Sequence, residues 1–296
     1  MQYRLSNRWI VGALGLAAWL AVSGRAASPP HDPSTPTRLA LISDLHVMVG
    51  TTNVEQPIYM GRLDTTIAAV NRAKVDLVVV AGDLTEHGTA SELAAFRRQT
   101  RNLSAPVLFV PGNHDVGNKL IPGVKKDPTT ASRTDAYELE NGRSFFKSEE
   151  AGVRVIGLNS CLLGSQLGRE QQMWEFLEKE LAQPAKVPTV LLLHHPPFLK
   201  KPGEPGGDYF NIEPEPRARL LALAKQGGVS AILSGHLHHG LTNWVNGMVL
   251  LTTPPVSYGL PKGKQPEGWT LVTVQGTNVT WDFQPLAPGP RDTRSP

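Results

Sequence analysis

The chain has 296 residues, of which 40% are hydrophobic and 19% charged, and its formal net charge is +3. These values are ordinary for a globular protein, and the length suits one large α/β domain or two small ones. The single cysteine, Cys161, excludes an intrachain disulfide. We interpret Cys161 as a buried structural residue rather than a nucleophile.

The first segment has the layout of a secretory signal peptide. Arg4 and Arg8 precede an uncharged run over residues 9–23, and small residues follow up to Ala26. The run is short and alanine-rich for a membrane span, and an uncleaved anchor is the alternative. We expect residues 1–26 to be removed and the protein to be exported, to the periplasm or outside the cell. Membrane contact is expected only if the leader is retained.

The charge of the mature chain gives no reason to expect a nucleic-acid partner. Removing residues 1–26 removes three arginines, which leaves 26 basic residues against 26 acidic ones. A neutral chain lacks the overall positive charge that favours polyanions such as DNA. A small molecule is therefore the expected partner, and the oligomeric state stays open.

The remaining sequence divides into three parts. Residues 27–36 are rich in proline and small polar residues and read as a flexible lead-in. Residues 37–284 form the expected folded domain, and residues 285–296 are an expected disordered tail. Within the domain, residues 116–143 and 198–214 have no clear period, and we interpret both as long loops that wall a substrate pocket.

Apolar runs and amphipathic stretches alternate along the first part of the domain, which is typical of βαβ units. Strands are predicted at residues 39–43, 77–81, 107–110, 153–158, 189–193 and 231–233. Helices are predicted around Leu63, Ile67 and Val70, around Leu93 and Phe96, around Trp174, Leu177 and Leu181, and around Leu220 and Leu223. Fully apolar strands indicate a sheet covered on both faces.

The last part of the domain changes style. Residues 244–249 carry Asn246-Gly247 between apolar residues, a strong type I′ hairpin signal. Residues 269–274 and 279–283 read as antiparallel strands around a turn. The chain therefore predicts mixed sheets packed between helices in one domain.

Five short polar motifs directly follow predicted strands, which brings residues far apart in sequence to one sheet edge. The motifs are Asp44-Leu45-His46, Gly82-Asp83, Gly112-Asn113-His114-Asp115, His194-His195-Pro196-Pro197 and Gly235-His236-Leu237-His238. Their mixed oxygen and nitrogen donors suit Mn, Fe, Co or Zn. In Asp44/His46 and His236/His238, residues two apart on an extended segment would point to the same side.

Each motif alone is weak, but the order and completeness of all five are informative. The pattern resembles the calcineurin-like metallophosphoesterase superfamily, and most of all its class III cyclic nucleotide phosphodiesterase and glycerophosphodiesterase-type members. The resemblance covers about residues 37–283. It implies an α/β fold, a four-layer αββα sandwich of two mixed β-sheets flanked by helices, with two divalent metal ions at one edge of the sheets.

The resemblance also implies the ligands. The first metal would be held by Asp44, His46 and His238, with Asp83 bridging to the second. The second metal would be held by Asn113, His194 and His236. His195 is then expected to support the ligands or to be structural.

The resemblance implies that His114 contacts the phosphate and assists the leaving oxygen. Asp115 either orients His114 or caps a turn, and both readings stay open. Glu86 stands where the purple acid phosphatase branch has a tyrosine ligand, so a tyrosinate-bound ferric centre is not expected. For Glu86 we favour a solvated residue over one that supports the ligands, and for His239 an exposed turn residue over a substrate contact.

The leading hypothesis is a phosphodiesterase in which hydroxide held by two metals attacks in line, since no motif residue is left over for covalent catalysis. A phosphomonoesterase or nucleotidase would use the same metals with extra cations around the substrate. Candidate loop cations are Lys119, Lys125, Lys126, Arg133, Lys200 and Lys201. Tyr209 and Phe210 could stack on a nucleobase or pin their loop. A non-catalytic scaffold is the remaining alternative.

Overall fold

The computed structural model describes residues 35–50, 52–124, 127–183 and 185–286. The expected signal peptide, the lead-in up to residue 34 and the expected tail from residue 287 lie outside the described residues. Among the described residues, no helix has the length and apolarity needed to cross a bilayer.

The first of two mixed sheets has the strand order β11-β10-β1-β2-β3. Its strands are β1 (Thr37–Ile42), β2 (Leu77–Ala81), β3 (Val107–Val110), β10 (Gly268–Gln275) and β11 (Asn278–Pro285). β1, β2 and β3 are parallel, whereas β10 pairs antiparallel with both β1 and β11. The first sheet therefore combines a βαβ unit with a C-terminal hairpin.

The second sheet has the order β4-β5-β6-β7-β9-β8. Its strands are β4 (Phe146–Glu150), β5 (Val153–Gly157), β6 (Thr189–Leu192), β7 (Val229–Ser234), β8 (Leu241–Val245) and β9 (Met248–Thr252). The central strands β5, β6, β7 and β9 are parallel, and the edge strands β4 and β8 are antiparallel to their neighbours. Antiparallel edges on a parallel centre make this sheet mixed as well.

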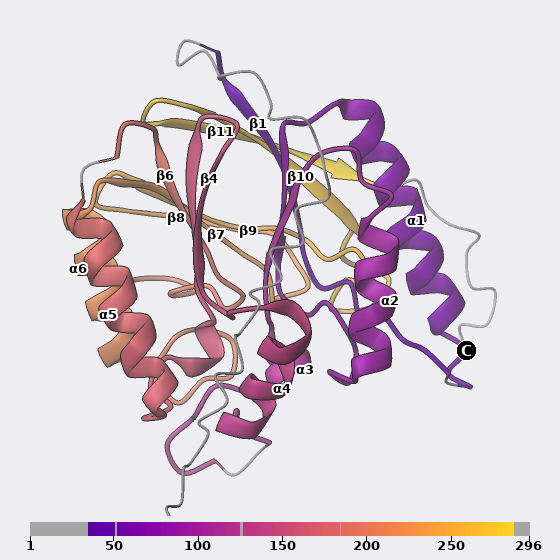
Figure 1. The fold of residues 1–296 in the computed structure, drawn as a ribbon, viewed down its shortest axis with the longest axis horizontal. Helices are drawn as coiled ribbons and strands as arrows, with labels where there is room; N and C mark the ends of the chain where they lie inside the picture. Colours follow the sequence, from indigo (N-terminus) through magenta and orange to yellow (C-terminus); the bar gives the residue numbers. More distant parts are fainter. Residues whose placement is uncertain (1–34, 51, 125–126, 184, 287–296) are drawn as a thin grey trace, which may run out of the picture.

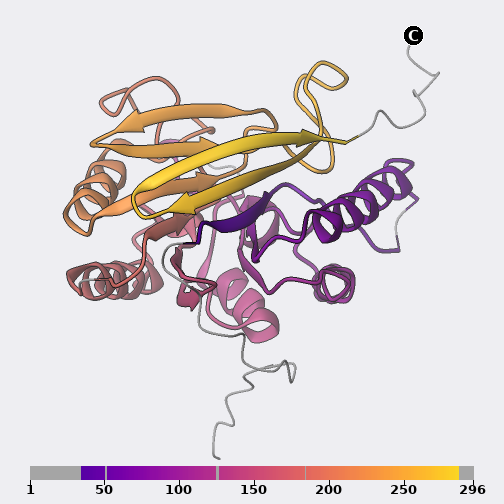
Figure 2. The same cartoon turned by 90° about the horizontal axis from the view of Figure 1, so that it is seen from above.

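Helices cover the outer face of each sheet. Figures 1 and 2 show α1 (Gln56–Ala73) and α2 (Ala90–Thr100) on one side, with α5 (Gly168–Ala182) and α6 (Pro214–Gln226) on the other. One apolar cluster fills the space between the two sheets, and two more lie beneath the helix pairs. The central strands are therefore covered on both faces, and the predicted four-layer αββα sandwich is confirmed.

Most predicted elements are confirmed, including β2 and β3 with their predicted bounds. The hairpin joins β8 to β9, where Asn246 and Gly247 have φ of 53° and 80°, as a type I′ turn requires. The prediction of one long loop over residues 116–143 was wrong. This stretch contains α4 (Ala131–Asn141), capped by the Thr130 hydroxyl, and the short α3 (Asn113–Val116) precedes it. Sequence reasoning also missed β4.

A close approach between the sheets requires glycine at position 235. A Cβ on Gly235 would lie 1.7 Å from Ser43 Oγ and 2.7 Å from Asp44 Oδ2. These atoms belong to the turn after β1, whereas Gly235 follows β7. The absence of a side chain thus lets the ends of strands from the two sheets touch.

We expect Gly235→Ala to lower the free energy of unfolding by about 1–3 kcal/mol, because the backbone must shift to admit the methyl group. Gly61→Ala is the matched control: it lies in α1 and its Cβ meets nothing within 4 Å. There alanine should raise stability by about 0.5–1 kcal/mol. Urea unfolding of both variants measures the difference, and equal midpoints would contradict the steric argument.

Candidate metal centre

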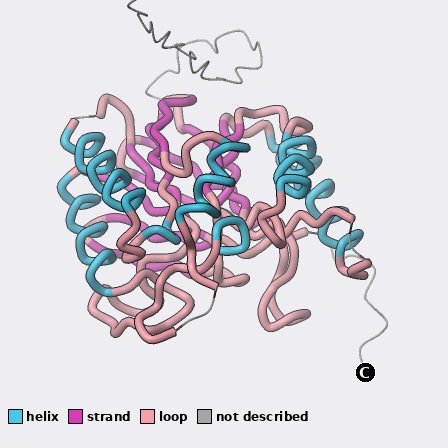
Figure 3. Tube along the Cα trace, turned by 60° about the horizontal axis from the view of Figure 1, so that its bottom comes forward, coloured by secondary structure: helices cyan, strands magenta, loops and turns pink. Residues whose placement is uncertain are grey.

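The polar motifs gather at one edge of the paired sheets. They follow the carboxyl ends of β1, β2, β3, β6 and β7, and Figure 3, with this edge turned forward, shows the loops that cross it. Backbone hydrogen bonds join neighbouring motifs, from Asp44 N–H to the Gly82 carbonyl oxygen (3.1 Å) and from Gly235 N–H to the His194 carbonyl oxygen (3.0 Å). The sheets therefore position the motifs directly.

The motif segments are not extended, so this expectation was wrong. Five of their polar residues have left-handed φ angles, which are 53° at Asp44, 48° at His46, 46° at Asp83, 73° at His236 and 55° at His238. Left-handed conformations at non-glycine residues are strained and concentrate at functional sites. The side chains converge through these sharp turns rather than through strand alternation.

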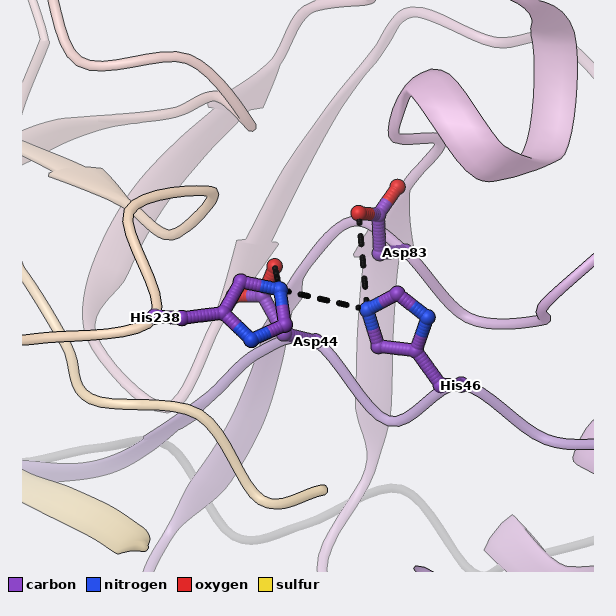
Figure 4. A group of neighbouring side chains, drawn as sticks. All are labelled: Asp44, His46, Asp83 and His238. Carbon is purple, nitrogen blue, oxygen red and sulfur yellow. Dashed lines mark hydrogen bonds and ion pairs between the residues drawn. The ribbon is translucent and has the colours of Figure 1, made fainter. Parts of the chain in front are cut away.

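The first half of the cluster contains Asp44, His46, Asp83 and His238, all buried (Figure 4). His238 Nε2 lies 3.3 Å from Asp44 Oδ1 and 3.3 Å from His46 Nε2. His46 Nε2 lies 3.7 Å from Asp83 Oδ2. Four ligand-type atoms therefore face a common point.

The second half contains Asn113, His194 and His236, and it shares Asp83 with the first. His194 Nε2 lies 3.3 Å from Asp83 Oδ2, 3.0 Å from Asn113 Oδ1 and 3.1 Å from His236 Nδ1. Asp83 Oδ2 thus stands between the two halves, while Asp83 Oδ1 accepts a hydrogen bond from the His114 backbone N–H (2.9 Å). The structure thus brings all seven predicted ligands together, and their assignment to two metal ions stays a prediction.

Oxygen acceptors hold the outer ring nitrogen of each histidine. These pairs are His46 Nδ1 with Glu86 Oε2 (2.7 Å), His194 Nδ1 with the Ala81 carbonyl (2.8 Å), His236 Nε2 with the Tyr209 carbonyl (3.2 Å), and His238 Nδ1 with the Tyr258 carbonyl (2.6 Å). A ring that donates outward turns the lone pair of its inner nitrogen to the centre.

The inner nitrogens of His236 and His238 consequently face the centre as acceptors. Burial lowers the pKa values of His236 and His238, which keeps both rings neutral near pH 7. Although burial opposes it, the Asp83 carboxylate raises the pKa of His194 to about 9, so a proton on that ring balances the carboxylate when no cation does. Asp44 Oδ1 is buried with no hydrogen-bond partner among the described residues. Lone pairs about 3 Å apart repel unless a proton or a cation lies between them, so the donor set fits a pair of divalent cations.

Glu86 is not the solvated residue that the sequence favoured, but the alternative, a half-buried partner of a predicted ligand. Although burial opposes it, the hydrogen bond from His46 lowers the pKa of Glu86, which keeps the carboxylate ionised. The Glu86 backbone carbonyl also accepts from His114 Nδ1 (2.9 Å). The only sequence signal for this role was the position of Glu86, three residues after Asp83.

The Asp115 carboxylate is used for backbone fixation. It accepts hydrogen bonds from the N–H groups of Gly112 (2.8 Å), Leu84 (3.1 Å) and Thr85 (3.0 Å), and from the Thr85 hydroxyl (2.7 Å). These contacts tie the turn after β3 to the turn after β2. Asp115 therefore acts on His114 through the backbone rather than by touching its ring.

His195 and Cys161 lie in the interior. His195 is fully buried and its Nδ1 lies 2.9 Å from Ser160 Oγ, while its ring packs 4.2 Å from that of His236. Cys161 is buried in the cluster beneath α1 and α2, and burial raises the pKa of its thiol. The burial of both residues is that of structural side chains.

An open cavity of about 530 Å³ adjoins the second half of the cluster. His114, Asn113 and Tyr209 line it, together with residues of α4 and of the stretch that precedes it. The two segments expected to wall a pocket therefore do so. Tyr209, which sequence reasoning treated as a stacking or packing residue, accepts a hydrogen bond from Asn113 Nδ2 (3.0 Å).

The charges of the cavity wall are largely neutralised. Arg133, the one lysine or arginine among the residues lining this described cavity, pairs with Asp127 (2.7 Å). Lys119 is buried and pairs with Glu213 (2.6 Å), and Lys200 and Lys201 are exposed elsewhere. The remaining predicted cations, Lys125 and Lys126, lie outside the described residues.

Comparison with known proteins identifies the family. The family model for calcineurin-like phosphoesterases matches residues 37–240. A probable glycerophosphodiester phosphodiesterase from Arcobacter nitrofigilis is 31% identical over 190 residues, which is 63% of this chain and 65% of that relative. A protein named as a serine/threonine-protein phosphatase from Danio rerio is 28% identical over 74% of this chain and 72% of its own length.

The fold has solved counterparts. A purple acid phosphatase from yellow lupin superposes with a TM-score of 0.60 at 15% identity, covering 88% of this chain and 53% of the lupin chain. Its likeness extends over both sheets and not over a single motif. With the motif cluster at the sheet edge and the family match over most of the domain, the chain belongs to the calcineurin-like phosphoesterase family.

Proposed function

We propose that this protein is a phosphodiesterase that depends on two divalent metal ions. The observation that carries the proposal is the inward array of acceptor atoms in which Asp83 Oδ2 stands between two half-sites. Asp44, His46 and His238 would hold one ion, and Asn113, His194 and His236 the other. Bound divalent ions would supply an acidified water molecule and neutralise charge on the phosphoryl oxygens.

The protein's own groups orient the reaction. The His114 backbone N–H holds Asp83 Oδ1, which leaves Oδ2 free to be shared between the half-sites. The His114 ring donates from Nδ1 to the Glu86 carbonyl, so its Nε2 is available to a substrate in the cavity. A proton on Nε2 would neutralise the departing alkoxide, which is the role of a general acid.

The charge of the cavity favours a diester over a monoester. A phosphomonoester carries a second negative charge that gains from additional cations. In the described cavity, however, Arg133 is already paired with Asp127, and Glu86 adds a carboxylate. A diester has one charge fewer and carries a second alcohol that this space can accept. The similarity to the glycerophosphodiesterase relative supports the same reading, and a phosphomonoesterase remains the second candidate because of the phosphatase relative.

We expect metal-stripped protein to be inactive and to regain activity with Mn²⁺, Co²⁺ or Zn²⁺, added one at a time. Rates on bis(p-nitrophenyl) phosphate should exceed rates on the p-nitrophenyl monoester.

Asp83→Ala removes the shared ligand and should abolish turnover, whereas Asp64→Ala, on the exposed face of α1, should not change it. Undiminished metal-dependent turnover of Asp83→Ala would overturn the proposal, and wild-type inactivity with every ion would favour a scaffold.

His114→Ala should slow the hydrolysis of diesters with alkyl leaving groups by about 10²–10⁴-fold, because an alkoxide leaves poorly without a proton. The loss of rate on a p-nitrophenyl diester should be smaller, since nitrophenolate is a stable anion. Comparing kcat for the two leaving groups in wild type and variant checks this role. An equal loss on both substrates would assign His114 to binding instead.

A further inference from the structure

The segment over residues 198–213 lies beside the second half-site and contains neither helix nor strand, yet charged groups fix it in place. The Glu204 carboxylate accepts hydrogen bonds from the backbone N–H groups of Leu199 (2.7 Å), Lys200 (2.8 Å) and Lys201 (3.3 Å). Arg217 on α6 is buried and lies against Glu204, with Nη1 at 3.7 Å from Oε1. One carboxylate thus closes the first turn of the segment.

Glu213 fixes the other end of the segment. Its carboxylate pairs with Lys119 Nζ (2.6 Å), and Lys119 is 2% exposed. The same carboxylate accepts a hydrogen bond from the Gly207 N–H (3.0 Å). Lys119 belongs to the stretch that follows α3, so this buried pair connects the two segments that line the cavity.

Tyr209 is the point at which this fixed segment touches the predicted ligands. Its hydroxyl oxygen accepts a hydrogen bond from Asn113 Nδ2 (3.0 Å). Its main-chain carbonyl faces His236 Nε2 (3.2 Å), and its ring lies 4.7 Å from the His236 ring. One residue outside the ligand set therefore contacts two of the three ligands that belong to the second half-site alone.

The hydroxyl determines which end of the Asn113 amide faces the centre. A carboxamide can rotate to present either oxygen or nitrogen, and only the oxygen binds a cation. With Nδ2 held by Tyr209, Asn113 Oδ1 points inward, 3.0 Å from His194 Nε2. Without the hydroxyl, the amide would have to be oriented by the cation itself, which weakens binding.

We propose that Tyr209 is a positioning residue that sets the affinity of the second half-site for its metal ion. This inference rests on the proposed dimetal centre. The first half-site is held by other groups, Glu86 at His46 and the Tyr258 carbonyl at His238. The effect of the Tyr209 hydroxyl should therefore be confined to one of the two ions.

The test is calorimetric titration of metal-free protein with Mn²⁺, with bound metal counted by elemental analysis. Wild type should bind two ions, and Asn113→Ala should bind only the first with its affinity retained. Tyr209→Phe should bind the first ion with unchanged affinity and the second ion about 10–100-fold more weakly, as for other groups that orient ligands. Tyr137→Phe, which removes a buried hydroxyl on α4, should bind as wild type does.

Two unchanged affinities in Tyr209→Phe would overturn the inference while leaving the dimetal centre intact. A wild type that binds fewer than two ions would instead remove the dimetal centre. Equal weakening of both ions in Tyr209→Phe would assign the hydroxyl to the general stability of the site, and would also contradict the proposal.

Glu213→Gln tests whether the fixed segment delivers Tyr209. Leaving Lys119 buried without its carboxylate should lower the midpoint of thermal unfolding by about 10 °C. It should also weaken the binding of the second ion. The control Glu178→Gln removes an exposed pair with Arg219 (2.7 Å) and should change neither quantity. A destabilised Glu213→Gln with wild-type affinity for both ions would show that Tyr209 is seated independently of this pair.

Discussion

The organising constraint of this protein is the crowding of electron lone pairs in a buried space at one edge of the paired sheets. Each of the four histidines at the centre has an oxygen acceptor at its outer nitrogen, which turns its inner lone pair toward its neighbours. The carboxylates of Asp44 and Asp83 add negative charge to the same space. Without cations, protons must offset this crowding, and neighbouring carboxylates raise the pKa values of His46 and His194 against the effect of burial. Bound divalent cations would replace those protons.

Backbone strain around the centre follows from the same constraint. A left-handed conformation at a residue other than glycine costs about 1–2 kcal/mol, and five such residues lie in the motifs. Asp115 offsets part of this cost by binding the turns that follow β2 and β3, and Gly235 by allowing the sheets to approach. Hydrogen bonds from neighbouring turns hold the backbone in these strained conformations.

The sequence predicted the strands and the gathering of motif residues well, because apolar runs and fixed motif order are local signals. The ligand roles of these residues stay predictions. Glu86 and Tyr209 were misjudged, since each acts through a contact between segments distant in the chain. The Lys119–Glu213 pair was missed for the same reason, because nothing local distinguishes a buried lysine from a solvated one. α4 and β4 were missed because their exposed faces blur the hydrophobic period.

The division of the centre between two sheets has one further consequence. Asp44, Asp83 and Asn113 follow strands of the first sheet, whereas His194, His236 and His238 follow strands of the second. The spacing of opposing donors is therefore inherited from the thickness of the apolar filling between the sheets, which includes Val79 and Leu192. Apolar side chains in the interior, which do not take part in the reaction, thus set the distance between the ligand groups of the two sheets.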